Sequence, residues 1–308
     1  MNKNNKQLIY ILSGEHSGDL HGANLIKELT LQSKNTLIFR GLGGPLMQSE
    51  GLTSIESFNR LSVMGFVEVL KKLSFFIKLK QKIIDDIVAC KPVKIILIDY
   101  PGFNLKIAKA IKQKIKTKIF YYISPQIWAW KEGRINTIKD YVDEMIVLFP
   151  FEVFWYKQRN VNVNYFGHPL IDIYNSEKLS SKNISEITIG VFPGSRKQEI
   201  DQHVPILNKT IQLLRNNLKN VRFVIGINKE LKHDFTNVLN LQSNDLILEN
   251  NAFNIFNQCR VAIVASGTAT LECAITETPM VVVYKMSKIS WWISKRFIKI
   301  PFASIVNI

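Results

Sequence analysis

The 308-residue sequence predicts an α/β protein with two doubly wound, Rossmann-like domains, and three observations carry this prediction. Short aliphatic runs alternate along the chain with segments whose apolar residues recur every three or four positions, which is the pattern of βα units. The aliphatic runs are four to six residues long and mostly apolar, as in parallel strands buried on both faces. A polar stretch at 175–185 separates two such series, so we expect domains at 1–174 and 175–308.

Five strands are predicted before the polar stretch and four after it. They are 8–12, 37–40, 95–98, 118–122, 145–148, 187–192, 222–225, 261–265 and 280–284. Helices are predicted between several of them. In one of these helices Ile107, Ala108, Ile111 and Ile115 share a face, and lysines occupy the other side. Such a helix packs its apolar face against the sheet.

Composition excludes several classes of protein. With 46% hydrophobic and 21% charged residues, the chain is globular rather than disordered or collagen-like. Cys90, Cys259 and Cys273 lie far apart without a CxxC pair, which argues against a disulfide framework or a zinc site and favours the reducing cytoplasm. No stretch approaches the roughly 18 uncharged residues of a membrane span, and the apolar run at 8–12 is too short for a signal peptide.

Basic charge is concentrated in two windows. Forty Lys and Arg against 25 Asp and Glu give a net charge of +15. Residues 71–118 contain thirteen lysines and three acids (13 − 3 = +10) and residues 288–299 add +4, so the windows hold 14 of the 15 excess charges. Such patches suit nucleic acid, an anionic membrane or a phosphorylated substrate. Nucleic acid is disfavoured, because the windows coincide with apolar helical segments rather than with the stacking aromatics of a recognised module.

Apolar residues of the first window fall on one predicted helix face. They are Phe66, Val69, Leu70, Leu73, Phe76 and Ile77, with Phe75 and Leu79 widening the face and Lys71, Lys72 and Lys78 beside it. A helix packed on the core gives the same stripe, whereas a basic, amphipathic helix also lies in membrane interfaces. The segment 289–297 repeats this chemistry with two tryptophans, which favour membrane interfaces. We therefore expect salt-sensitive binding to anionic membranes.

The loop after the first strand contains Gly14, Glu15, Ser17 and Asp19. Ligands of open α/β sheets collect beyond the carboxyl ends of strands, and the glycines here allow a ligand to approach the backbone. The loop lacks the GxGxxG pattern of dinucleotide sites. In the alternative interpretation it is a tight turn in which Ser17 or Asp19 caps the next helix, and a capped helix N-terminus is itself suited to anions.

Asp99 directly follows the apolar strand at 95–98. Burial there would raise the pKa of its carboxyl group, which suits a general base, although a loop or capping acid explains the position equally well.

A further segment, 121–130, holds four aromatic residues that are by default core residues. Ser124 and Gln126 in the same segment are alternatives for lining a sugar site.

Two loops of the second half suit a nucleotide diphosphate. The first, 192–197, combines backbone N–H groups with Arg196 and Lys197, although an exposed turn with solvated charges has the same composition. The second, 266–272, places small hydroxyl residues at a helix N-terminus, where phosphate binds readily. Glu272, one turn into that helix, either accepts hydrogen bonds from ribose hydroxyls or is an exposed helical residue.

Ten blocks distributed over nearly the whole chain match a known family. They are SGEHSGDLHGANL (13–25), GLGGPLMQSEG (41–51), LSVMGFVEVL (61–70), DYPGFNLKIAK (99–109), YYISPQIWAWKEGRINTIKDYVD (121–143), FPFE (149–152), FGHPLID (166–172), FPGSRKQEI (192–200), SGTATLE (266–272) and PMVVVYKMS (279–287). On these blocks the chain resembles the lipid-A-disaccharide synthases, which are inverting glycosyltransferases of the two-Rossmann GT-B type, family 19. The SPQIWAW and GSRKQEI stretches are more specific than the glycine loops that all GT-B enzymes share.

The resemblance implies a reaction and a set of site residues. The donor would be UDP-2,3-diacylglucosamine and the acceptor 2,3-diacylglucosamine 1-phosphate, whose 6-hydroxyl displaces UDP with inversion to give the β-1,6-linked lipid A disaccharide 1-phosphate. Asp99 matches the general base. The residues that match substrate- or nucleotide-binding positions are Gly14, Glu15, Ser17, Asp19, Ser124, Gln126, Ser195, Arg196, Gln198, Ser266, Gly267, Thr268, Ala269, Thr270, Glu272 and Asn307. Neither a metal nor another cofactor is expected, because helix dipoles and basic side chains offset the leaving-group charge.

The resemblance also bears on the chain end and the location. The family's chain continues past the segment that matches 304–308, so we expect a C-terminally truncated second domain that lacks its last helices. The implied location is the cytoplasm of a Gram-negative bacterium, peripheral on the inner face of the inner membrane. Two alternatives stay open, namely an inactive, truncated membrane-binding remnant and another GT-B enzyme that uses a UDP-sugar.

Overall fold

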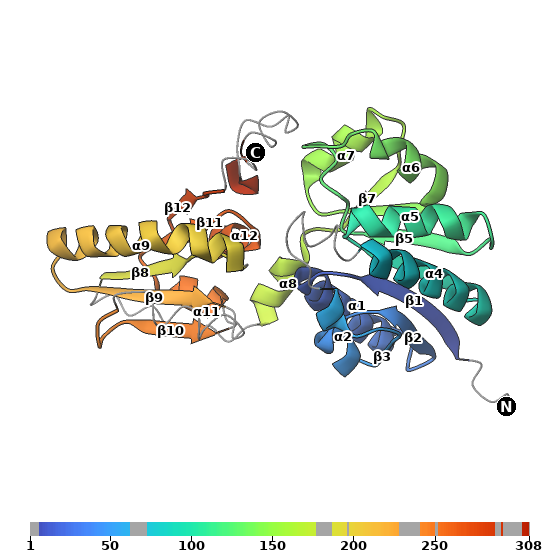
Figure 1. The fold of residues 1–308 in the computed structure, drawn as a ribbon, viewed down its shortest axis with the longest axis horizontal. Helices are drawn as coiled ribbons and strands as arrows, with labels where there is room; N and C mark the ends of the chain where they lie inside the picture. The colour runs from blue at the N-terminus through green and yellow to red at the C-terminus, as the bar shows by residue number, and fades with distance from the viewer. Residues whose placement is uncertain are drawn as a thin grey trace. The chain divides into compact units, whose positions relative to one another are not determined.

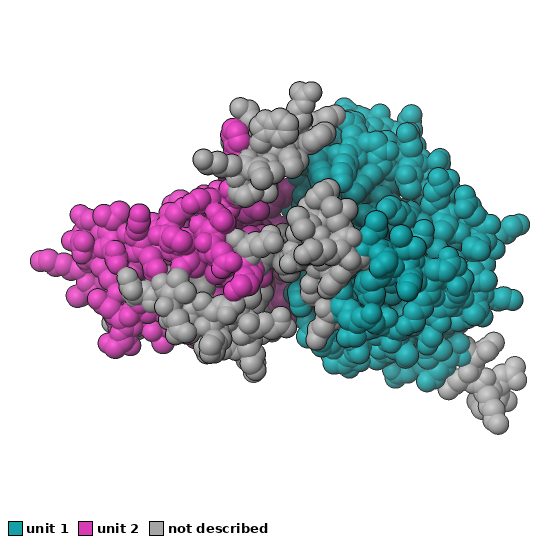
Figure 2. Space-filling view, in the orientation of Figure 1, with its two compact units in different colours: residues 1–169 teal, residues 170–308 magenta. Residues whose placement is uncertain are grey.

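The computed structural model describes residues 6–61, 73–176, 187–195, 197–227, 241–249, 252–286, 291 and 304–307. It divides into two compact units, Met1–Pro169 and Leu170–Ile308 (Figure 2). Each unit has its own parallel sheet, which confirms the predicted α/β class with two Rossmann-like sheets. Most of the polar stretch predicted as a linker, 177–185, lies outside the described residues.

The sheet of unit 1 has seven parallel strands in the order β3-β2-β1-β4-β5-β6-β7 (Figure 1). The strands are β1 (Gln7–Ser13), β2 (Leu37–Leu42), β3 (Leu52–Ser54), β4 (Lys94–Ile98), β5 (Lys118–Tyr122), β6 (Glu144–Val147) and β7 (Val163–Tyr165). The helices are α1 (His16–Gln32), α2 (Pro45–Ser49), α4 (Leu73–Cys90), α5 (Pro101–Lys112), α6 (Arg134–Tyr141) and α7 (Pro150–Lys157), with a 3-10 turn at Phe58–Arg60 and α8 (Pro169–Ser176) at the unit boundary.

The sheet of unit 2 has five parallel strands in the order β10-β9-β8-β11-β12. The strands are β8 (Ile187–Phe192), β9 (Val221–Ile227), β10 (Leu246–Glu249), β11 (Val261–Ala265) and β12 (Met280–Val283). The described helices are α9 (Lys197–Asn217), α11 (Ala252–Gln258) and α12 (Thr268–Ile275), with a 3-10 turn at Ile305–Asn307.

Both sheets are covered by helices on two faces, as the apolar strands predict. In β1, Tyr10 and Leu12 belong to the core cluster of α4 and α5, whereas Ile9 and Ile11 belong to the cluster of α1 and α2. This alternation follows from the two-residue repeat of a strand. In unit 2, residues of β8 likewise divide between a cluster with α9 and a cluster with α11 and α12.

The nine predicted strands are confirmed with shifts of up to two residues, and three further strands were not predicted. These are β3, β7 and β10, which have three, three and four residues and lie at the outer edges of the two sheets. A segment that short gives no measurable hydrophobic period, so pairing with a neighbouring strand decides its conformation. The predicted helix face was also too long, because α5 ends at Lys112 and Ile115 packs on the core from beyond the helix.

The strand order reverses between β1 and β4 in unit 1 and between β8 and β11 in unit 2. At such a switch point the loops that leave neighbouring strands diverge to opposite faces of the sheet, which opens the crevice where ligands of doubly wound folds bind. The four loops singled out from the sequence are therefore the loops at these two switch points.

The apolar stripe of the first basic window divides between the core and the surface. Phe76 packs on the core of unit 1 and Leu79 is buried, so that part of the membrane-facing prediction is wrong. Leu73 and Ile77 remain 50% and 57% exposed. The stripe residues before position 73, and the window 288–299 apart from Trp291, lie outside the described residues. Along the described ranges of the chain, none of the helices combines the length and the apolar character needed to cross a bilayer.

Candidate functional site

Asp99 lies at a left-handed bend that directly follows β4. Asp99 and Tyr100 have φ angles of 43° and 49°, a conformation that costs energy for residues other than glycine. Side-chain hydrogen bonds help to hold the bend. The side-chain amide of Asn104 donates to the carbonyl oxygens of Ile98 (3.2 Å) and Asp99 (2.8 Å), and the Tyr121 hydroxyl also donates to the Asp99 carbonyl (2.5 Å). The backbone of Asp99 is therefore fixed while its carboxyl group stays available.

The loop after β1 lies against this bend, because Ser13 and Ile98 are partners in neighbouring strands. A Cβ atom on Gly14 would lie 2.5 Å from the Tyr100 ring, so the close approach requires glycine. Burial, followed by repulsion from the adjacent Glu15, raises the pKa of Asp99 to about 7. The expectation that an acid at this strand end has a raised pKa is thus confirmed.

Asp19 links α1 to the start of the following helix α2. It is buried, and its carboxylate accepts hydrogen bonds from the backbone N–H groups of Leu46 (3.1 Å) and Met47 (3.0 Å) at the start of α2. The alternative that Ser17 or Asp19 caps α1 is wrong, since Glu15 is the N-cap residue and makes no side-chain capping bond. Asp19 instead caps a helix that follows in the sequence, and its contact with a ligand stays a prediction.

The aromatic segment after β5 is anchored by a buried carboxylate that the sequence interpretation missed. Glu152 accepts hydrogen bonds from the Ser124 hydroxyl (2.5 Å) and the Trp128 ring N–H (3.1 Å). Its other oxygen accepts from the backbone N–H groups of Leu148 and Phe149, both at 3.0 Å. Ser124 therefore has a structural partner.

The same segment is only partly core. Trp128 is buried, in agreement with the default interpretation, whereas Trp130 is 43% exposed and Gln126 is also exposed. Gln126 thus remains available to a ligand. The spacing of a helix capping box at FPFE, in which Glu152 is the third helical residue, is the signal that could have identified Glu152.

In unit 2, the loop after β8 turns at Gly194, whose φ of 120° favours glycine. Ser195 is exposed, and its backbone N–H donates to the Glu199 carboxylate (3.2 Å). Arg196 and the side chain of Gln198 lie outside the described residues. The loop leads directly into the N-terminus of helix α9, and its binding of phosphate stays a prediction.

His203 links this loop to the end of β12, and nothing in the sequence indicated it. Its Nδ1 lies 2.7 Å from the Pro193 carbonyl oxygen, and its Nε2 accepts a hydrogen bond from the backbone N–H of Lys285 (2.8 Å). Nε2 must be unprotonated to accept, so Nδ1 carries the proton and donates to Pro193. The buried His203 imidazole thus holds together two segments whose bonded residues, Pro193 and Lys285, are 92 positions apart (285 − 193 = 92).

The loop after β11 borders the loop after β8, because Phe192 and Val264 are strand partners. Ser266 is half-buried, Gly267 and Thr268 are exposed, Ala269 is half-buried, and Thr270 is buried with its hydroxyl donating to the Gly267 carbonyl (2.7 Å). Thr270 therefore shapes the turn, and its contact with a ligand stays a prediction.

Glu272 and Asn307 lie close to this loop. Burial raises the pKa of Glu272 to about 7, and no hydrogen-bond partner of its carboxyl group occurs in the described part of the chain. The Ser304 hydroxyl donates to Thr270 (3.4 Å), which brings the exposed Asn307, on the same short turn, beside the start of α12. The structure thus brings the described sequence-predicted residues of unit 2 to one switch point.

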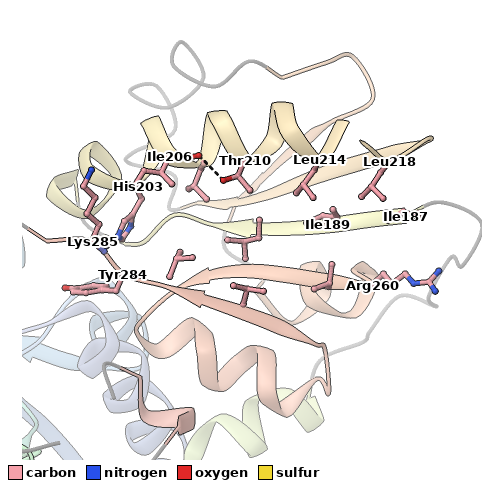
Figure 3. A pocket seen from close by; sticks show the side chains of 15 residues that line it. Ile187, Ile189, His203, Ile206, Thr210, Leu214, Leu218, Arg260, Tyr284 and Lys285 are labelled. Atoms are coloured by element: carbon pink, nitrogen blue, oxygen red, sulfur yellow. Dashed lines mark hydrogen bonds between the residues drawn. The ribbon is translucent and has the colours of Figure 1, made fainter. Parts of the chain in front are cut away.

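A separate cavity of about 900 Å³ lies between α9 and the sheet of unit 2 (Figure 3). The side chains of Ile206 and Leu214 extend from the helix, and that of Leu218 from just beyond its end, toward those of Ile187 and Ile189 on β8 (Figure 3). Its lining is mostly aliphatic and offers few partners for phosphates or sugar hydroxyls. The groups of unit 2 that suit phosphates and sugar hydroxyls are instead those of the loops after β8 and β11.

Comparison with known proteins gives the family. The family model described as lipid-A-disaccharide synthetase matches residues 9–308. A lipid-A-disaccharide synthase 1 of Legionella pneumophila (strain Paris) is 38% identical over 313 residues, which is 99% of this chain and 81% of that protein. The chain belongs to the lipid-A-disaccharide synthetase family. A lipid-A-disaccharide synthase of Geobacter sulfurreducens, 36% identical over 317 residues, covers all of this chain and 82% of its own length.

Solved structures with much lower identity share the fold. UDP-GlcNAc 2-epimerase of Neisseria meningitidis, solved with bound UDP-GlcNAc, superposes with a TM-score of 0.64 at 12% identity, covering 93% of this chain and 85% of the epimerase. MurG of Acinetobacter baumannii gives a TM-score of 0.54 at 10% identity, covering 94% and 82% of the two chains. The fold is thus the GT-B fold, and the family makes this chain a glycosyltransferase of lipid A synthesis.

Proposed function

We propose that the chain joins UDP-2,3-diacylglucosamine to 2,3-diacylglucosamine 1-phosphate, releasing UDP and the β-1,6-linked disaccharide 1-phosphate. The observation that supports this most directly is Asp99, an acid with a pKa of about 7 at the switch point of unit 1. A general base works best when its pKa lies near the working pH, because about half of it is then ionised and the ionised form is still basic enough to take a proton.

In the proposed step, the Asp99 carboxylate accepts the proton of the acceptor's 6-hydroxyl as that oxygen attacks the anomeric carbon of the donor. The bond to the UDP oxygen breaks on the opposite face of the sugar, which inverts the configuration. The backbone N–H groups of the loop after β8 and of the α12 N-terminus, together with Arg196, stabilise the charge on the diphosphate. Glu272 accepts hydrogen bonds from the ribose hydroxyls.

The test replaces Asp99 with Asn. Asparagine tolerates the left-handed backbone conformation of this position, whereas alanine would add strain to the loss of the carboxylate. We expect transfer to fall by about 100-fold or more, since a general base contributes roughly 10²–10⁴-fold, while the dissociation constant for UDP stays unchanged. Transfer at the wild-type rate would rule out Asp99 as the base, and loss of UDP binding would indicate a structural role.

We further propose that unit 1 contacts an anionic membrane through the exposed part of α4. Leu73 and Ile77 lie four positions apart on that helix and are exposed, and Lys78 beside them is also exposed. Exposed apolar residues flanked by lysines suit the headgroup region, where the charge attraction weakens with salt. The double variant Leu73→Gln, Ile77→Gln should sediment less with anionic vesicles than the wild type. Equal sedimentation of both proteins would contradict this contact.

A further inference from the structure

Two cationic side chains lie over the exposed Trp130 ring in unit 1, and a third cation lies near one of them. The Lys131 ammonium lies 4.1 Å from the centroid of the Trp130 ring, and the Arg134 guanidinium carbon lies 5.8 Å from it. Lys106 on α5 is close enough to Lys131 for the two charges to repel each other. We refer to Lys106, Trp130, Lys131 and Arg134 as the Trp130 cluster.

The cluster lacks the negative charge that its cations require. Within the described ranges, Lys106, Lys131 and Arg134 form no ion pair with any carboxylate, and the neighbouring Glu132 is paired with Arg159 at 2.8 Å. Burial lowers the pKa of Arg134, and burial followed by repulsion from Arg134 and Lys106 lowers that of Lys131. Both effects disfavour the charged forms and are relieved by an anion.

The alternative interpretation is a set of solvated surface charges, and Arg134 argues against it. Its side chain is half-buried and its Nη2 atom lies 3.8 Å from the position of a Cβ atom on Gly102, so it packs over the first turn of α5. A guanidinium carries five donors in a planar fork that matches phosphate geometry. A half-buried fork without a carboxylate partner is a site prepared for an oxyanion rather than a side chain free in water.

The cluster lies next to the proposed base. Arg134 is close enough to Tyr121 for each to affect the pKa of the other, and the Tyr121 hydroxyl donates to the Asp99 carbonyl at 2.5 Å. Lys106 is on α5, the helix that begins two residues after Asp99. A ligand held by the cluster is thus presented close to Asp99, and the exposed Trp130 ring offers an apolar face for its sugar.

We propose that Lys106, Lys131 and Arg134 bind the phosphate monoester of the acceptor sugar, with Trp130 packed against the sugar ring. This assignment rests on the proposed function. A phosphate monoester carries nearly two negative charges at neutral pH, which suits three cations better than a carboxylate or a neutral sugar. The cluster then selects the phosphorylated acceptor, while the nucleotide is held by residues of unit 2.

The decisive test compares two acceptors in two enzymes. One acceptor is 2,3-diacylglucosamine 1-phosphate, and the other is the same lipid without its phosphate. Wild type should prefer the phosphorylated acceptor in kcat/KM by about 10- to 100-fold, the range expected for hydrogen bonds to a charged group. The double variant Lys131→Ala, Arg134→Ala should lose most of that preference, with little change for the unphosphorylated acceptor or for the KM of the donor.

Lys139→Ala is the matched control, because Lys139 is an exposed lysine on the same helix as Arg134. It should keep the preference for the phosphorylated acceptor. An equal loss for both acceptors in the double variant, or an unchanged preference, would overturn the proposal. If the double variant fails to fold, the exposed Lys106→Ala and Lys131→Gln variants are compared in the same way, and an unchanged preference in both overturns the proposal.

A binding measurement separates this proposal from the proposed function. Glucosamine 1-phosphate, glucosamine and inorganic phosphate are each titrated onto the full chain by calorimetry. Tighter binding of glucosamine 1-phosphate than of the other two, weakened at least tenfold in the double variant, supports the site even if no transfer is detected. Inorganic phosphate binding as tightly as the sugar phosphate, or equal affinities in wild type and double variant, would overturn the assignment.

Discussion

Replacing Glu15 with Gln should lower the pKa of Asp99 and move the acidic limb of the pH–rate profile to lower pH. Glutamine keeps the shape and most of the hydrogen-bonding capacity of Glu15 and removes only its charge. Repulsion from that charge is the second cause, after burial, of the raised pKa of Asp99. Without it the carboxylate form is less disfavoured, so the base is ionised, and active, at lower pH.

The magnitude follows from the ionised fraction of the base. With a pKa of about 7 against an ordinary 3.8, about one-tenth of Asp99 is ionised at pH 6 and about one-hundredth at pH 5. A fall in pKa of one unit would ionise about half of the base at pH 6 and raise the rate there about fivefold. The burial of Asp99 is unchanged in the variant, so the acidic limb of its profile should still lie at a higher pH than an ordinary aspartate would give.

The assay is UDP release with saturating acceptor, followed as kcat/KM for the donor between about pH 5 and pH 9. The acceptor phosphate has a second pKa of about 6 and titrates in the same range, but it does so equally for both enzymes. The informative quantity is therefore the difference between the wild-type and Glu15→Gln profiles. Glu28→Gln, at an exposed acid within α1, the helix that Glu15 precedes as its N-cap residue, is the control. Superimposable profiles for wild type and Glu15→Gln would refute the reasoning.

Two further substitutions probe how the loops are held. Gly14→Ala places a methyl group 2.5 Å from the Tyr100 ring, so the transfer rate should fall about tenfold or more. Gly133→Ala is the control, because its methyl group meets open space, and it should retain wild-type activity in the same assay. His203→Ala leaves two bridged backbone groups without their partner, so the free energy of unfolding in urea should drop by about 1–3 kcal/mol and UDP should bind more weakly. Gln202→Ala, at an exposed neighbouring residue, should change neither the unfolding free energy nor the affinity for UDP. Equal effects of His203→Ala and Gln202→Ala would contradict the bridging role of His203.

Strand positions could be predicted where the sequence itself carries the signal. β5, β8 and β11 match their predicted bounds without any shift, because each is a short, mostly apolar run rich in β-branched or aromatic residues. The edge strands β3 and β7 have three residues each, and their conformation depends on pairing with β2 and β6. Such pairing is a tertiary interaction, and no local pattern encodes it.

The candidate site likewise contains residues whose role could be predicted from the sequence and residues whose role could not. Asp99 was predictable because an acid that follows a buried strand is constrained by its neighbours in sequence. The partners of His203 are 10 and 82 residues away, and those of Asp19 are 27 and 28 residues away, so neither role is visible in a local motif. The Trp130 cluster likewise requires α5 and α6 to be packed together before its cations meet.

Hydrogen-bond satisfaction separates the buried acids into two kinds. Glu152 accepts four hydrogen bonds from its own unit, and these donors replace water and offset part of the cost of its burial. Glu272 has no such partner in the described part of the chain, and Asp99 has only the Tyr100 backbone N–H to offset burial and Glu15. An acid held in this way destabilises the fold unless a ligand supplies the missing donors. Both poorly satisfied acids lie at switch points, where sugar and ribose hydroxyls would supply those donors, whereas Glu152 follows β6, away from the reversal. The distinction therefore rests on physical grounds that are independent of the family resemblance, and it selects Asp99 and Glu272, two of the four acids that the resemblance implies.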